Sequence, residues 1–141
     1  MSRLIKTGKQ IKIFLGGTCA DSEWRDLLIP LLNINFFDPR VDDWNEEAQK
    51  NERHEREVDD YCLYTITPEM AGVYSIAEVT DDSNKRPQKT IFCILEKDGI
   101  KTFSKGQLKS LVQVGEMVKR NGGKFFTNLK DVADFVNGSK L

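Results

Sequence analysis

The residue best placed for chemistry in this sequence is Glu78, the last residue of the segment YCLYTITPEMAGVYSIAE. The apolar and β-branched start of this segment favours a buried strand, Thr67 and Pro68 end it, and Gly72 permits a sharp turn. Helical spacing begins at Val73, so Glu78 falls in the first turns of a helix, beside the edge where parallel sheets bind ligands. A carboxylate there could attack an anomeric carbon and carry a covalent glycosyl intermediate. An exposed helix glutamate is the alternative.

Gly16, Gly17 and Thr18 follow a short apolar strand candidate and form a second candidate site. A glycine turn lets backbone amides and the threonine hydroxyl approach a ligand at the start of the next helix. The pattern matches neither the dinucleotide-binding fingerprint nor the phosphate-binding loop. A tight strand-to-helix turn without a ligand is the alternative.

Asp38 lies at the end of the second predicted strand and Trp44 follows that strand, at the same rim of the sheet. Acidic groups there could hold sugar hydroxyls, and an indole could stack on a base. The alternative is an Asp-Pro turn with solvated charges.

The remaining polar clusters favour structural roles. His54, the only histidine, lies in the charged run Glu46–Glu57 on a solvated helix, so neither a zinc site nor a Ser-His-Asp triad is available. This leaves carboxylate chemistry without a metal or cofactor. Asp59 and Asp60 are interpreted as caps of a helix-to-strand turn, and Glu96–Asp98 as an ordinary charged turn.

Strand-like and helix-like segments alternate along the whole chain. The predicted strands are Ile11–Leu15, Asn35–Pro39, Tyr61–Thr67, Thr90–Glu96 and Lys124–Thr127. The predicted helices are Ser22–Leu32, Asn45–Val58, Val73–Asp82, Ser104–Arg120 and Leu129–Val136. Because a parallel crossover needs a helix, this order predicts an α/β fold, a flavodoxin-like or Rossmann-like three-layer sandwich with a five-stranded parallel sheet. We expect a flexible N-terminal tail, residues 1–10, and a single domain, residues 11–141.

The amino-acid composition limits the classes of binding partner that we expect for this chain. The chain has 141 residues, with 21 Lys and Arg against 22 Asp and Glu, so its net charge of -1 provides no basic field for a polynucleotide. The three cysteines are widely spaced, which favours a reducing, cytoplasmic setting. We see no signal peptide or membrane span and expect no membrane partner. The expected partner is a small molecule.

Four stretches together resemble the nucleoside 2-deoxyribosyltransferase-like family. They are IFLGGTC, FFDPRVDDW, DDYCLYTITPEMAGVYSIAEVTDD and KTIFCIL, and they cover roughly residues 11 to 95. The segment GVYSIAE is the most specific part of the resemblance.

The resemblance implies a flavodoxin-like fold and cleavage of an N-glycosidic bond by a glutamate nucleophile, which aligns with Glu78. It also implies that Gly16 and Gly17 line the sugar or 5′-phosphate pocket and that Asp38 and Trp44 lie near the base. In well-characterised transferases an aspartate six residues before the nucleophile holds the deoxyribose, and here that position is Gly72.

Our hypothesis from the sequence is an enzyme that transfers or hydrolyses a (deoxy)ribosyl group of a nucleoside, nucleotide or related N-glycoside. Glu78 is the nucleophile, Tyr74 and Ser75 orient it or touch the sugar, Thr18 helps to bind the sugar or phosphate, and Asp38 contacts or protonates the base. The alternatives are a catalytically silent nucleotide-binding or interaction module and an NAD glycohydrolase. Related transferases complete their sites across subunits, which implies a homo-oligomer by analogy.

Overall fold

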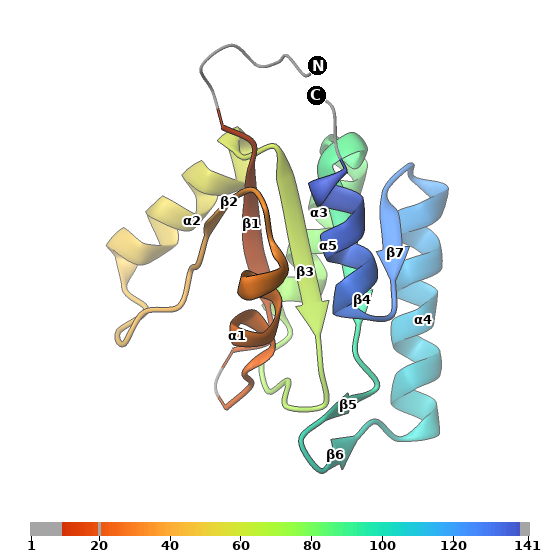
Figure 1. The fold of residues 1–141 in the computed structure, drawn as a ribbon. Coiled ribbons are helices and arrows are strands. Elements are labelled where there is room, and N and C mark those ends of the chain that lie inside the picture. The colour runs from red at the N-terminus through yellow and green to blue at the C-terminus, as the bar shows by residue number, and fades with distance from the viewer. Residues whose placement is uncertain (1–9, 20, 139–141) are drawn as a thin grey trace.

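The computed structural model of this chain describes residues 10–19 and 21–138, so the expected N-terminal tail lies outside the described residues except for Gln10. Within this part, five strands form one parallel sheet in the order β2, β1, β3, β4, β7 (Figure 1). The strands are β1 Lys12–Gly17, β2 Asn35–Phe37, β3 Tyr61–Ile66, β4 Thr90–Ile94 and β7 Lys124–Phe126. This is the flavodoxin-like order, in which the chain reverses direction across the sheet between β1 and β3. The predicted fold class is confirmed.

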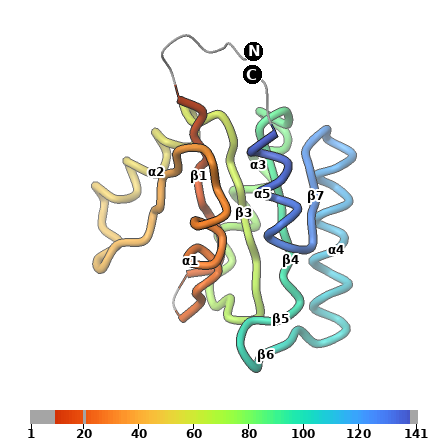
Figure 2. The backbone as a smooth tube through the Cα atoms, in the orientation of Figure 1, coloured from red at the N-terminus to blue at the C-terminus, as the bar shows by residue number. Residues whose placement is uncertain are grey.

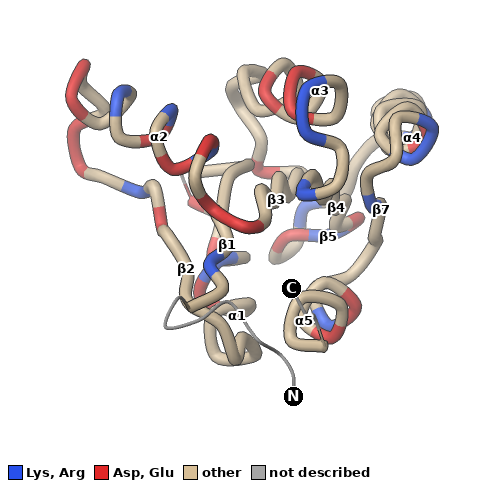
Figure 3. The backbone as a smooth tube through the Cα atoms, turned by 90° about the horizontal axis from the view of Figure 1, so that it is seen from above, with Lys and Arg blue, Asp and Glu red and all other residues tan. Residues whose placement is uncertain are grey.

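Helices cover both faces of the sheet. Seen along the strands, α2, α3 and α4 lie on one face, and α1 and α5 lie on the other (Figure 3). The helices are α1 Trp24–Leu28, α2 Glu46–Val58, α3 Tyr74–Lys85, α4 Lys105–Arg120 and α5 Leu129–Asn137. None of the helices in the described ranges has the length and apolar character needed to cross a membrane.

Alternate side chains of the strands supply two cores, one under each helical layer. Ile13 and Leu63 pack with Trp24 of α1 and Val132 of α5, whereas the opposite face of the strands packs against α3 and α4. Every residue of β3 and β4 is buried, which explains why these two segments are continuously apolar in the sequence.

The first helix is shorter than predicted. The expected helix over residues 22–32 is an α-helix only at Trp24–Leu28, and Ile29–Leu31 form a 3-10 turn. Pro30 explains the difference, because proline has no N–H and its ring clashes with the carbonyl four residues earlier in an α-helix.

Two residues of the expected charged turn Glu96–Asp98 belong to a small antiparallel hairpin, with strands β5 Lys97–Asp98 and β6 Lys101–Thr102. Gly99, at its tip, has a φ of 62°, a conformation that glycine adopts without strain. The hairpin lies beyond the carboxyl ends of β3 and β4, beside the loop that follows β3 (Figure 2).

Candidate active site

A cavity of about 610 Å³ opens at the carboxyl ends of β1 and β3, the position where the strand order reverses. Five segments line it: β1 with its following turn, helix α1 through Arg25, the loop after β2, helix α2, and the end of β3 with the loop and helix that follow it. All the candidate residues from the sequence except Asp38 line this one cavity: Gly16, Gly17, Thr18, Trp44, Gly72, Tyr74, Ser75 and Glu78.

The glycine turn after β1 is fixed by backbone contacts. Gly17 has a φ of 121°, and a Cβ atom there would lie 2.1 Å from the carbonyl oxygen of Thr65, so only glycine fits. The amide of Thr18 donates to the same Thr65 carbonyl at 2.8 Å, and the Thr18 hydroxyl accepts from the amide of Thr67 at 3.0 Å. The turn therefore joins the ends of β1 and β3 and shapes the cavity floor.

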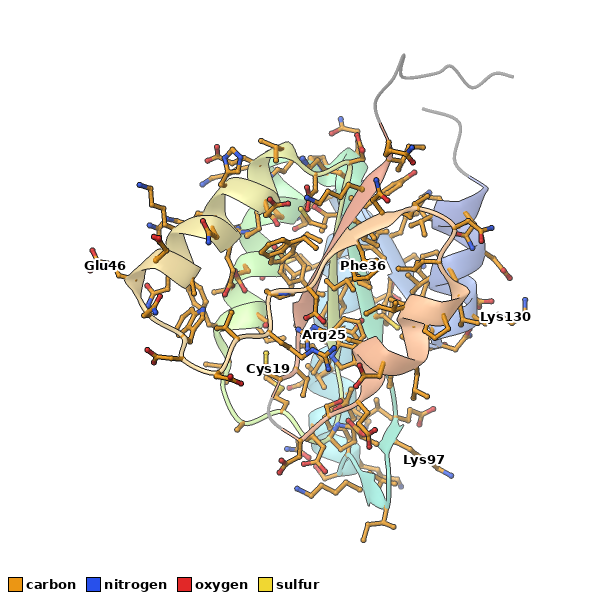
Figure 4. All side chains as sticks on the ribbon, turned by 60° about the vertical axis from the view of Figure 1, so that its left-hand side comes forward. Cys19, Arg25, Phe36, Glu46, Lys97 and Lys130 are labelled. Atoms are coloured by element: carbon orange, nitrogen blue, oxygen red, sulfur yellow. The ribbon has the colours of Figure 1, made fainter. Side chains whose placement is uncertain are left out.

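Arg25 of α1 holds this turn in place through hydrogen bonds to backbone carbonyl groups. This role was not predicted from the sequence. The Arg25 guanidinium is buried and donates to the carbonyl oxygens of Leu15 and Thr18 at 2.9 and 2.8 Å (Figure 4). The indole N–H of Trp24 donates to the Thr18 carbonyl as well, at 2.7 Å. Arg25 thus binds the backbone of both β1 and the turn that follows it.

Glu78 is the fifth residue of α3 and lies in the wall of the cavity, only 8% exposed. Burial raises the pKa of its carboxyl group to about 7, and the negative charges of Glu52 and Asp82 act in the same direction. The guanidinium of Arg56 opposes this rise, with its Nη1 atom 3.6 Å from Oε2 of Glu78. Near neutral pH this carboxyl group is therefore divided between its protonated and ionised forms.

Arg56 joins α2 to α3 through a buried cluster. Its Nη2 lies 2.9 Å from Oδ1 of Asp82, which is fully buried and also accepts a hydrogen bond from the hydroxyl of Tyr64. Arg86, the residue that follows the end of α3, donates to Asp82 at 2.9 Å. The assignment of the whole charged run of α2 to solvent was wrong for Arg56, which is 7% exposed.

Glu52 is a second carboxylate in the same cavity, one turn before Arg56 on α2. It accepts a hydrogen bond from the indole N–H of Trp44, which also lines the cavity. Burial raises the pKa of Glu52 above its usual value, although the Trp44 hydrogen bond acts in the opposite direction. Glu52 and Arg56 are four residues apart and lie on the same side of α2, but the exposed residues Arg53 and Glu57 have the same spacing, so no sequence signal singles out this inner face.

Asp38 lies just outside the cavity, although Pro39 and Arg40, which follow it, line the cavity. Its carboxylate is 2.7 Å from Nη2 of Arg40 and 3.8 Å from Nε of Arg25. Burial acts to raise the pKa of Asp38, but the hydrogen bonds and charge of Arg40 outweigh it and hold the pKa below its usual value. Asp38 is therefore a poor proton donor.

The segment before α3 completes the cavity. Tyr74 is largely exposed at the mouth, and Ser75 is partly buried beside it. A Cβ atom on Gly72 would meet no heavy atom within 4 Å, and Gly72 does not adopt a positive φ. The structure thus does not require glycine at this position. Over the described residues, no three His, Cys, Asp or Glu side chains converge to form a possible metal site.

A comparison with known protein families identifies one match. The family model described as nucleoside 2-deoxyribosyltransferase like matches residues 10–97, which include β1 to β4 and the candidate residues of the cavity. No curated protein and no solved structure matches the chain.

Proposed function

Because the chain belongs to the nucleoside 2-deoxyribosyltransferase-like family, we propose that it cleaves the N-glycosidic bond of a small nucleoside, nucleotide or related N-glycoside, with Glu78 as the nucleophile. One observation carries the proposal: Glu78 is buried in the wall of a cavity large enough for such a molecule, with an arginine beside its carboxylate. A buried carboxylate with a raised pKa in a cleft is typical of catalytic groups.

The first chemical step follows from these groups. An oxygen of the Glu78 carboxylate bonds to the anomeric carbon while the bond from that carbon to the base nitrogen breaks. The electron pair of the broken bond goes to the base, which needs a proton. Glu52 supplies it in our proposal, because its raised pKa keeps it protonated at a higher pH than an ordinary glutamate.

The second step releases the sugar from Glu78. Water attacks the anomeric carbon in a hydrolase, and a second base does so in a transferase. In both cases Glu78 leaves as a carboxylate and Glu52 accepts the proton of the attacking group. Trp44, beside Glu52, offers an aromatic surface for the base, and the floor formed by Gly16, Gly17 and Thr18 faces the sugar.

The test is a panel of ribo- and deoxyribonucleosides, nucleoside monophosphates and NAD, scored by chromatography for the released base. We expect release with the parent protein and none above background with Glu78→Gln, which keeps the size of the side chain but removes its charge. If NAD is the one compound of the panel that is cleaved, with release of nicotinamide, the chain is instead an NAD glycohydrolase. If no compound is cleaved, and one binds the parent and Glu78→Gln equally well, the proposal is wrong and the chain is a silent binding module.

A further inference from the structure

Two loops at the carboxyl edge of the sheet carry residues of the cavity. The loop after β1 contributes Thr18 and Cys19, and the loop after β3 contributes Met70, Ala71 and Gly72. The hairpin formed by β5 and β6 lies beyond both loops (Figure 2). None of its residues, 97–102, lines the cavity.

Asp98 of β5 binds both loops through one carboxylate oxygen. Its Oδ2 atom accepts hydrogen bonds from the hydroxyl groups of Ser22 and Thr67, each at 2.5 Å. Ser22 is 4% exposed and Thr67 is fully buried, so water has little access to either hydroxyl. Short hydrogen bonds to an ionised acceptor are stronger than those between neutral groups.

The direction of these bonds organises the backbone of each loop. A hydroxyl group has one proton to donate. When it donates that proton in a hydrogen bond to Asp98, its oxygen can still accept a hydrogen bond from a backbone amide. The Ser22 oxygen accepts from the amide of Trp24 at 3.4 Å, and the Thr67 oxygen accepts from the amide of Glu69 at 3.1 Å. Asp98 thus orients the groups that hold the start of α1 and the turn after β3.

The network continues to the cavity floor. The amide of Thr67 donates to the hydroxyl of Thr18 at 3.0 Å, and Thr18 lines the cavity. A second contact ties the hairpin to the same loop, because Nζ of Lys101 lies 2.9 Å from Oε1 of Glu69.

From this geometry we propose that Asp98 is a positioning residue, which fixes the loops after β1 and β3 in the arrangement that forms the ligand cavity. Its effect on turnover rests on the proposed function, whereas its effect on the two loops does not. Removal of the carboxylate leaves two buried hydroxyl groups without their acceptor and frees both loops together.

The test is amide hydrogen exchange on the full chain, followed by mass spectrometry with fragmentation. In Asp98→Ala we expect the amides of Trp24, Glu69 and Met70 to exchange about tenfold faster or more, while amides in the centre of β3 and β4 stay as slow as in the parent. Asp98→Asn keeps an acceptor oxygen and should restore part of the protection. Ser22→Ala breaks one of the two bonds and should speed exchange near Trp24 alone.

Lys97→Ala is the matched control, since Lys97 is the neighbouring residue of β5 and its side chain points into solvent (Figure 4). It should leave both loops as in the parent. The proposal is wrong if faster exchange in Asp98→Ala stays within residues 97–102, or if Lys97→Ala has the same effect. If Asp98→Ala does not fold, unchanged exchange in both Asp98→Asn and Ser22→Ala overturns it.

Kinetics separate this proposal from the proposed function. If base release is found, Asp98→Ala should raise KM about tenfold and more than it lowers kcat, with the pH dependence of kcat/KM unchanged, because the Arg56–Glu78 contact is intact. Looser loops in a protein without activity would contradict only the proposed function. Unaltered loops in an active enzyme would contradict only the role of Asp98.

Discussion

The guanidinium of Arg56 on α2 lies 3.6 Å from the carboxylate of Glu78 on α3, and both side chains are at least 90% buried. Arg56 also contacts Asp82 and the partly exposed Asp81, so one cation faces three carboxyl groups, two of them buried. Its charge favours the ionised form of Glu78, which burial disfavours. These two opposing effects set the pKa of Glu78, the nucleophile that we propose, at about 7.

The first prediction concerns the pH dependence of base release. Attack needs an ionised Glu78, whose pKa is about 7, and protonation of the leaving base needs a protonated Glu52, whose pKa burial raises above its usual value. We therefore expect kcat/KM to rise with pH as Glu78 ionises and to fall at higher pH as Glu52 loses its proton, which gives a bell-shaped profile. The measurement is a pH profile from 5 to 9 on the best substrate of the panel. A profile already flat at pH 5 would mean that the attacking group is an ordinary exposed carboxylate.

The second prediction concerns Arg56. Arg56→Gln removes the positive charge beside Glu78 and should move the acidic limb of that profile to higher pH. It also leaves Asp82 buried without its main partner, which should lower the free energy of unfolding by about 3–5 kcal/mol. Arg56→Lys, which keeps the charge, is the control and should move the limb much less. Equal profiles for the parent and Arg56→Gln, measured below the melting temperature of both, would argue against the contact.

The third prediction distinguishes Glu52 from Asp38 as the proton donor. Glu52→Gln should lower kcat about 10²–10⁴-fold on an ordinary base, and a substrate whose leaving group needs no proton should recover most of that loss. Asp38→Asn should cost less, because Arg40 holds Asp38 in its ionised form. If Asp38→Asn lowers kcat more than Glu52→Gln does, Asp38 is the proton donor.

The fourth prediction is a loss of stability as the pH rises. Asp59 is buried next to Glu55, and burial raises its pKa to about 7. In the unfolded chain an aspartate ionises near pH 4, so between about pH 4 and 7 the folded state binds more protons and its stability falls as pH increases. Asp59→Asn should remove this part of the dependence. Urea unfolding at pH 5 and pH 8 measures it, and an unchanged difference between the two pH values would refute the effect.

The fifth prediction compares two glycines of the cavity. Gly17→Ala places a Cβ against the Thr65 carbonyl at a positive φ and should cost at least about 2 kcal/mol of stability. Gly72→Ala meets open space and should change stability by less than about 0.5 kcal/mol. Thermal and urea unfolding of both variants provide the comparison. A large loss for Gly72→Ala would show that the segment before α3 needs glycine.

The alternation of strands and helices, and the gathering of most cavity residues at one edge of the sheet, could be predicted from residue types and spacing. Gly17, Thr18, Gly72 and Glu78 all follow the carboxyl ends of two strands, and in a parallel sheet those ends meet at one edge. The strand order places β1 next to β3, so these residues come together once the fold class is known. These are local signals, since they depend on residue spacing within one segment and on the turn that follows it.

Which polar side chains turn inward depends on contacts between segments that are distant in the sequence. Arg56 meets Asp82 across 26 residues of sequence, and Ser22 meets Asp98 across 76. Nothing in the periodicity of α2 distinguishes Arg56 from its solvated neighbours, because a charged residue becomes a buried one only when another segment supplies its partner. The energy of burying such a group depends on that distant partner, so the contacts that tune Glu78 and fix the loops emerge only when the sheet brings the segments together.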